Sequence, residues 1–114
     1  MLPVKNRFNV LESKEGMKTA LKGRFFSVKW RFNGLSYIRA GVIIGKRYSS
    51  LAVRRNALKR EIFRVFEEGL KNGELSAGAD IVVSVLTNYR YFSDNTEEYK
   101  KELSNVLHIQ YIHI

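Results

Sequence analysis

The chain of 114 residues contains no cysteine, a single proline and no long hydrophobic run. The missing cysteine excludes disulfide bonds, thiolate metal ligands and a cysteine nucleophile. The start, MLPVKNRF, lacks the apolar core of a signal peptide, and no later segment approaches the ~20 apolar residues of a membrane-spanning helix. We therefore expect a soluble, cytoplasmic protein, and the length fits one domain over residues 1–114.

Acidic side chains are scarce in the first part of the chain. Residues 1–64 hold 16 basic and 3 acidic side chains, whereas residues 65–114 hold 4 and 8. This separation indicates a basic working face, and nucleic acid is the leading partner for such a small basic domain. No membrane partner is expected, because the chain has neither a long amphipathic basic helix nor a lipidation signal.

The chain also lacks the residue patterns of an enzyme's own active site. His108 and His113 have no acidic residue between them, and Glu97, Glu98 and Glu102 fit the exposed face of a helix better than a metal site. Neither a GxxxxGK[ST] nor a GxGxxG phosphate loop is present. We expect no catalytic and no metal-binding residues in the protein.

The first half of the chain predicts a helix and two strands. Ser13 to Leu21 fits a short helix, and residues 26–32 alternate between apolar and polar side chains as a strand with one apolar face does. Asn33-Gly34 is typical of a two-residue hairpin turn, so we expect residues 35–44 to pair with the first strand. The continuously apolar end of this return strand, residues 41–44, is expected at the centre of the sheet.

The second half predicts a basic helix, a buried strand and a closing helix. The basic segment spans residues 46–66, the strand residues 80–86, and the closing helix begins near Thr96. The apolar stripe of the basic helix comprises Leu58, Ile62, Val65 and Phe66. The order of elements favours an α/β layer with helices on a small mixed sheet, in which the basic helix joins two strands that could lie parallel.

The segment LAVRRNALKREIFRVF, residues 51–66, concentrates positive charge. Residues 54–64 carry five Lys and Arg side chains and one acid, Glu61. Like charges at helical spacing repel one another, which costs stability unless an anion compensates. A plain solvated face is the alternative, but the excess favours phosphate binding.

The same segment resembles the signature helix of the bacterial ribonuclease P protein family, which has the form A-V-x-R-N-R-x-K-R-x-x-R. The residues that match in register are Ala52, Val53, Arg55, Asn56, Lys59 and Arg60. Further similar stretches are Arg7-Phe8, Phe26, Arg39-Ala40-Gly41, Gly45-Lys46-Arg47 and Asp80-Ile81-Val82-Val83. The chain departs from the pattern at Ala57, where the family has the second arginine of R-N-R, and at Met17 and Leu21, where it has aromatics.

The resemblance implies a fold and a function. The fold is an α+β sandwich with the order α-β-β-β-α-β-α and an uncommon left-handed crossover through the basic helix. The function is that of the protein subunit of ribonuclease P, an endoribonuclease whose RNA component holds the catalytic Mg²⁺ ions and removes the 5′ leader of precursor tRNA. The implied partners are ribonuclease P RNA and precursor tRNA, with no cofactor bound by the protein alone.

The resemblance and the charge pattern together name two sets of site residues. Contacts to the RNA subunit are expected from Lys46, Arg47, Arg54, Arg55, Asn56, Lys59, Arg60 and Arg64. A leader-binding cleft between helix and sheet is expected to include Met17, Leu21, Phe26, Lys29 and Arg31. Two alternatives stay open: a structural RNA-binding protein of the ribosomal type with a similar β-α-β layout, and a small DNA-binding module whose basic helix enters the major groove.

Overall fold

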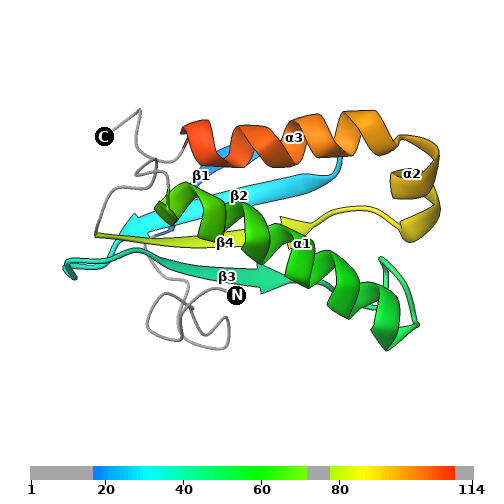
Figure 1. Cartoon of the computed structure of the whole chain (residues 1–114), viewed down its shortest axis with the longest axis horizontal. Helices are drawn as coiled ribbons and strands as arrows, with labels where there is room; N and C mark the ends of the chain where they lie inside the picture. Colours follow the sequence, from blue (N-terminus) through cyan, green and yellow to red (C-terminus); the bar gives the residue numbers. More distant parts are fainter. Residues whose placement is uncertain (1–16, 72–77, 110–114) are drawn as a thin grey trace.

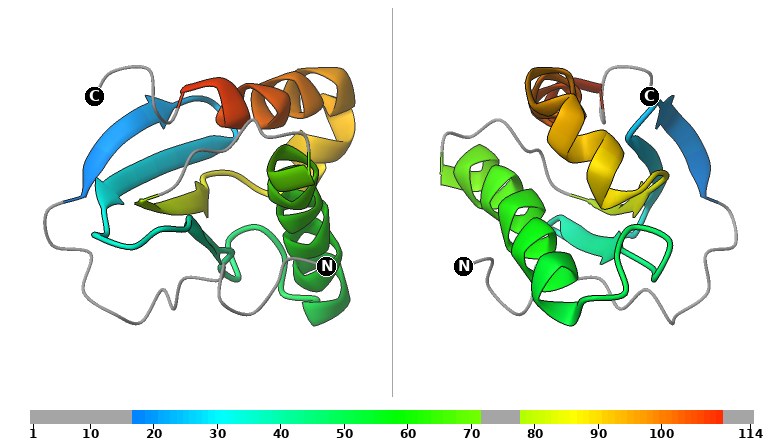
Figure 2. Two further views of the ribbon diagram at one scale, coloured as in Figure 1. Left: turned by 60° about the vertical axis from the view of Figure 1, so that its left-hand side comes forward. Right: turned by 90° about the vertical axis from the view of Figure 1, so that its right-hand side faces the viewer.

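The computed structural model describes residues 17–71 and 78–109. Its elements follow the order β1 (Lys18–Lys22), β2 (Phe26–Phe32), β3 (Arg39–Ile43), α1 (Ala52–Lys71), β4 (Ala79–Val85), α2 (Tyr89–Asp94) and α3 (Thr96–Ile109). The strands form one sheet with the order β1-β2-β4-β3. The described helices cover one face of this sheet, so the molecule has two layers (Figures 1 and 2).

The basic helix α1 connects two parallel strands. β3 and β4 run in the same direction, with Val42 opposite Val83, whereas β2 is antiparallel to β4. In Figure 1 both parallel strands point to the right, α1 lies in front of them, and β4 lies above β3. The β3–α1–β4 connection is therefore left-handed, as the resemblance implied, and belongs to the small minority of such crossovers.

Several predicted elements are confirmed. The strand predicted over residues 26–32 is β2, the basic helix is α1, the buried strand is β4 and the closing helix is α3. α1 extends five residues beyond the predicted end, through Gly69 to Lys71. The six-residue helix α2 was not predicted; it begins after Asn88, whose side chain accepts a hydrogen bond from the Tyr91 amide.

The prediction of a helix ending at Leu21 is wrong over residues 18–21, which belong to strand β1; residues 13–16 lie outside the described parts. β1 pairs antiparallel with β2, and the amide of Gly23 donates to the Phe26 carbonyl at 2.9 Å to close the turn between them. The apolar spacing of such a short segment fits a helix or a strand equally well. Pairing with the long strand β2 decides in favour of the strand.

The predicted hairpin between β2 and β3 is also wrong. β4 lies between these strands, so among the described strands β3 lies at the edge, and β2 and β4, not residues 41–44, are the inner strands. Gly34 does adopt a positive φ of 71°, and Asn33 accepts a hydrogen bond from the Leu35 amide at 2.8 Å. The Asn-Gly pair therefore makes a local turn at the end of the sheet, but local turn chemistry does not specify which strand becomes the neighbour.

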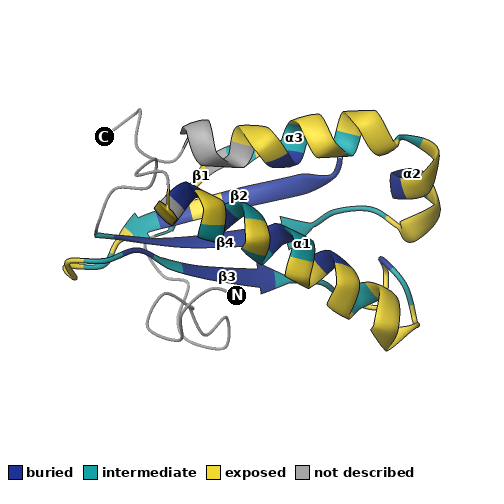
Figure 3. Ribbon diagram, in the orientation of Figure 1, coloured by how far each residue is buried: buried dark blue, intermediate teal, exposed yellow. Residues whose placement is uncertain are grey.

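The hydrophobic core fills the space between the sheet and the helices. Phe26, Val28 and Trp30 of β2 are buried on the helix side, as the alternation predicted, and Leu58 and Ile62 of α1 pack onto the sheet. Figure 3 shows the buried residues along the strands and the exposed residues on the outer surfaces of the helices. α1 therefore buries its apolar stripe and presents its opposite face to solvent.

A carboxylate on α3 fixes the turn between β1 and β2. Glu102 accepts hydrogen bonds from the consecutive backbone amides of Arg24, Phe25 and Phe26, at 3.0, 3.0 and 2.7 Å. The carboxylate thus satisfies three consecutive backbone donors with charge-assisted hydrogen bonds. This contact holds the first strands against the closing helix.

Candidate nucleic-acid interface

Helix α1 and the turn before it carry a set of mostly exposed cations together with Asn56, which we call the basic ridge. On α1, Asn56, Arg60 and Arg64 recur at intervals of four residues and are exposed, while Leu58 and Ile62 are buried on the other side. The ridge comprises Lys46, Arg47, Arg54, Arg55, Asn56, Lys59, Arg60 and Arg64, of which all but the half-buried Arg55 are exposed. These residues lie on α1 and in the turn before it, and their contact with RNA stays a prediction.

Two arginines of the ridge are held by contacts within the protein. Arg55 donates from Nη1 to the Ser49 carbonyl at 2.8 Å, which ties the helix to the preceding turn. Arg54 lies over the ring of Tyr89, with its guanidinium carbon 3.9 Å from the ring centroid. Such contacts restrict long side chains before any ligand arrives, so less conformational entropy is lost on binding.

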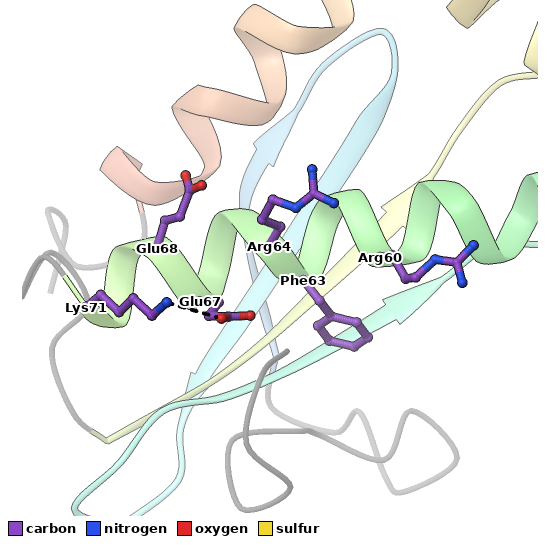
Figure 4. Close-up of a pocket in the computed structure, with 6 residues that line it drawn as sticks. All are labelled: Arg60, Phe63, Arg64, Glu67, Glu68 and Lys71. Atoms are coloured by element: carbon purple, nitrogen blue, oxygen red, sulfur yellow. Dashed lines mark ion pairs between the residues drawn. The ribbon is translucent and has the colours of Figure 1, made fainter.

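The positive charge ends in the second half of α1. The first turn of the helix contains no acidic residue, so the partial positive charge of its N-terminus adds to the ridge. Further along, Glu67 and Glu68 follow Arg64, and Lys71 forms an ion pair with Glu67 at 3.4 Å. These side chains line a hollow of about 450 Å³ with mixed charge (Figure 4). An anion is therefore favoured near the start of α1 rather than near its end.

A second basic region lies on the face of the sheet that no described helix covers. Lys29 is exposed there, and the wholly buried carboxylate of Asp80 binds Arg39 at 2.7 Å and Arg31 at 3.2 Å. Asn33 donates to the same carboxylate at 3.0 Å. Burial acts to raise the pKa of Asp80, but hydrogen bonds from Arg39 and Asn33 outweigh it and hold this pKa below its usual range. Two arginines thus share one carboxylate.

Comparison with known proteins decides the family. The model of the ribonuclease P family matches residues 12–110. The chain belongs to the ribonuclease P protein family. It is 32% identical to the ribonuclease P protein component of Pseudanabaena over 111 residues, which cover 94% of this chain and 92% of that protein.

Relatives from Thermotoga maritima extend the likeness to a solved structure. The ribonuclease P protein component of that organism is 39% identical over 70 residues, or 61% of this chain and 56% of the relative. The solved structure of the ribonuclease P protein of the same organism superimposes with a TM-score of 0.69 at 27% identity, covering 89% of this chain and 94% of that one. The fold described above is therefore that of a ribonuclease P protein.

The five residues expected to form a leader-binding cleft are not brought together. Because side chains alternate along β2, Phe26 is wholly buried in the core on the helix side, and Leu21 of β1 packs against the same core. Lys29 and Arg31 lie on the opposite face, and Met17 precedes β1 in a half-buried position. Side chains along a strand point alternately to its two faces, so residues that are close in a sequence alignment can lie on opposite faces of the sheet.

A tyrosine-lined groove of about 360 Å³ was missed by the sequence reasoning. It lies beside the first half of α1, and its walls include Tyr48, Arg54, Glu61, Tyr89 and Tyr99. Burial and the hydrogen bond to Glu61 raise the pKa of Tyr99, and burial with the neighbouring Tyr89 raises that of Tyr48, so both phenols stay protonated. The tyrosines come from separate segments, and no spacing in the sequence links them.

No group of three histidine or acidic side chains within residues 17–71 and 78–109 is arranged to hold a metal ion. Over the same residues, no helix combines the length and the apolar composition needed to cross a bilayer.

Proposed function

We propose that this chain is the protein subunit of ribonuclease P and that its basic ridge binds the phosphates of the RNA subunit. The observation that carries the proposal is that seven of the eight ridge residues are exposed, while Leu58 and Ile62 on the other side of α1 are buried. Cations on an exposed helix face suit phosphate binding, because each contact releases condensed counterions from the RNA. The protein acts in the 5′ maturation of tRNA as part of a cytoplasmic ribonucleoprotein.

In this proposal catalysis belongs to the RNA component. The protein supplies no catalytic residue and binds no cofactor alone, and the Mg²⁺ ions lie at the active site of the RNA. The contribution of the protein is to bind RNA and substrate.

The face of the sheet opposite the described helices is the proposed path of the 5′ leader of precursor tRNA. Lys29 of β2 supplies an exposed cation there, and Arg31 of the same strand, Asp80 of β4 and Arg39 of β3 form the group beside it. Leu21 and Phe26 contribute to this path only by shaping the core behind the sheet. Phosphate contacts, rather than base stacking, would dominate on a face with these side chains.

Reconstitution tests the proposal. The purified protein alone should not cleave precursor tRNA, and addition of ribonuclease P RNA should give removal of the leader. Sequencing of the RNA that co-purifies with the protein should return ribonuclease P RNA. Recovery of ribosomal RNA, or cleavage by the protein alone that survives replacement of Lys59 and Arg60, would overturn it.

A further inference from the structure

The groove beside α1 has a composition that phosphate binding does not explain. It combines the aromatic rings of Tyr48 and Tyr89 with the carboxylate of Glu61, the only acid among residues 46–64. A carboxylate repels phosphate, so Glu61 disfavours a phosphate at this place on the surface. The volume of about 360 Å³ is at the lower end of the range, roughly 300–1,000 Å³, of pockets that hold small ligands.

One side of the groove provides a flat platform. Tyr89 is partly exposed, and the exposed guanidinium of Arg54 lies over its ring at 3.9 Å from the centroid. Tyr48 contacts the Tyr89 ring edge-on, at 6.0 Å between centroids and 78° between planes, which fixes the orientation of that ring. Aromatic rings and guanidinium planes are the surfaces on which proteins stack unpaired RNA bases.

Glu61 provides hydrogen-bond acceptors in the same groove. Its carboxylate accepts from the hydroxyl of Tyr99, at 2.9 Å to Oε1 and 3.0 Å to Oε2. An ionised carboxylate can accept about four hydrogen bonds, so both oxygens retain capacity. The Watson–Crick edge of guanine places two donors side by side, N1–H and N2–H, which matches the two oxygens. Adenine and cytosine offer one amino group beside a ring nitrogen acceptor, and uracil one N–H between two carbonyls.

We propose that this groove binds a single unpaired guanine of the RNA subunit, stacked on the Arg54–Tyr89 pair with its Watson–Crick edge on Glu61. The inference rests on the proposed function, because it assigns one base of the partner RNA to one site. It adds base recognition to a surface whose other contacts go to phosphates and carry no sequence information.

Nucleotide titration tests the pocket without the RNA subunit. GMP, AMP, CMP and UMP are added separately to the full chain while the ring signals of the tyrosines are followed by NMR. GMP should shift the signals of Tyr48 and Tyr89 saturably and bind at least fivefold more tightly than the other three nucleotides. Equal binding of all four, or tyrosine signals that do not move, would overturn the proposal.

Variants of Glu61 separate recognition from structure. Glu61→Gln keeps an oxygen that accepts from Tyr99 but removes one of the two acceptors for guanine, so the preference for GMP should disappear at an unchanged unfolding temperature. Glu68→Gln on the same helix is the matched control, since Glu68 is exposed and lies outside the groove. A GMP preference that persists in Glu61→Gln would contradict the assignment.

Binding to ribonuclease P RNA tests the site in its complex. Tyr89→Leu should weaken binding about 5- to 150-fold, the range expected for the loss of one stacked base, with the salt dependence unchanged. The conservative Tyr89→Phe keeps the ring and should rescue most of this loss. If Tyr89→Leu binds as tightly as the unaltered protein, the proposed guanine binding in the groove is refuted, whereas the proposed function is unaffected. If the unaltered protein shows no preference for ribonuclease P RNA, the proposed function is refuted. The nucleotide titration then still tests whether the groove binds guanine.

Discussion

Replacement of Asp80 by asparagine should destabilise the protein strongly, because it removes the one carboxylate that two arginines share. The Asp80 side chain is wholly buried, and Arg31 and Arg39 contact it at 3.2 and 2.7 Å with exposures of 22% and 24%. Breaking a buried pair by removing one partner costs about 3–5 kcal/mol. Partial exposure of both arginines places the expected cost at the lower end, about 3 kcal/mol. For a domain of this size that lowers the unfolding temperature by roughly 10–15 °C.

Thermal unfolding followed by circular dichroism measures this difference, with Asp94→Asn as the matched control. Asp94 forms an exposed ion pair with Arg90 at 3.9 Å, so its replacement should change the unfolding free energy by less than about 0.5 kcal/mol. Because the pKa of Asp80 is lowered in the folded state, its contribution is complete at neutral pH and is lost as the pH falls through that pKa. The difference between Asp80→Asn and the unaltered protein should therefore shrink in acid. Equal unfolding temperatures for the two variants at neutral pH would refute the reasoning.

Three further outcomes are expected. Arg60→Ala should reduce the slope of log binding constant against log salt concentration for ribonuclease P RNA by about one unit, without changing the unfolding temperature. An unchanged slope would show that Arg60 is exposed to solvent and contacts no phosphate. Lys29→Ala should weaken binding of precursor tRNA to the assembled ribonucleoprotein, measured by equilibrium titration, and leave mature tRNA unaffected; equal weakening for both would place Lys29 outside the leader path. Glu102→Ala should cost about 2 kcal/mol in urea unfolding, because three backbone amides lose their acceptor, and a cost near zero would show that water replaces the carboxylate.

The sequence was most informative where burial follows a simple period. The alternation along β2 correctly separates Val28 and Trp30 from Lys29, and the spacing of Leu58 and Ile62 correctly identifies the buried side of α1. These features depend only on which face of an element is apolar. The exposure of Asn56, Arg60 and Arg64 followed directly, because they occupy the remaining face of the same helix.

The errors arose where the outcome depends on distant partners. Asn33 and Gly34 form a turn, but β4, which is nearly fifty residues away in sequence, inserts between the strands that the turn separates. The grouping of Phe26 with Lys29 failed because neighbours in an alignment can point to opposite faces of a strand. The tyrosine groove depends on packing of α2 and α3 against α1, which no periodicity encodes.

The position of β4 at the centre of the sheet has a consequence for synthesis on the ribosome. Of the four described strands it is the last in the chain, yet both β2 and β3 pair with it. Until residue 85 has left the exit tunnel, β3 has no hydrogen-bonding neighbour among the described strands, and the apolar stripe of α1 has only part of its docking surface. Non-local pairing of this kind delays folding, because the intervening loop must be closed first. The nascent chain therefore emerges with its strongly cationic part complete and its sheet unfinished, beside a particle made largely of RNA.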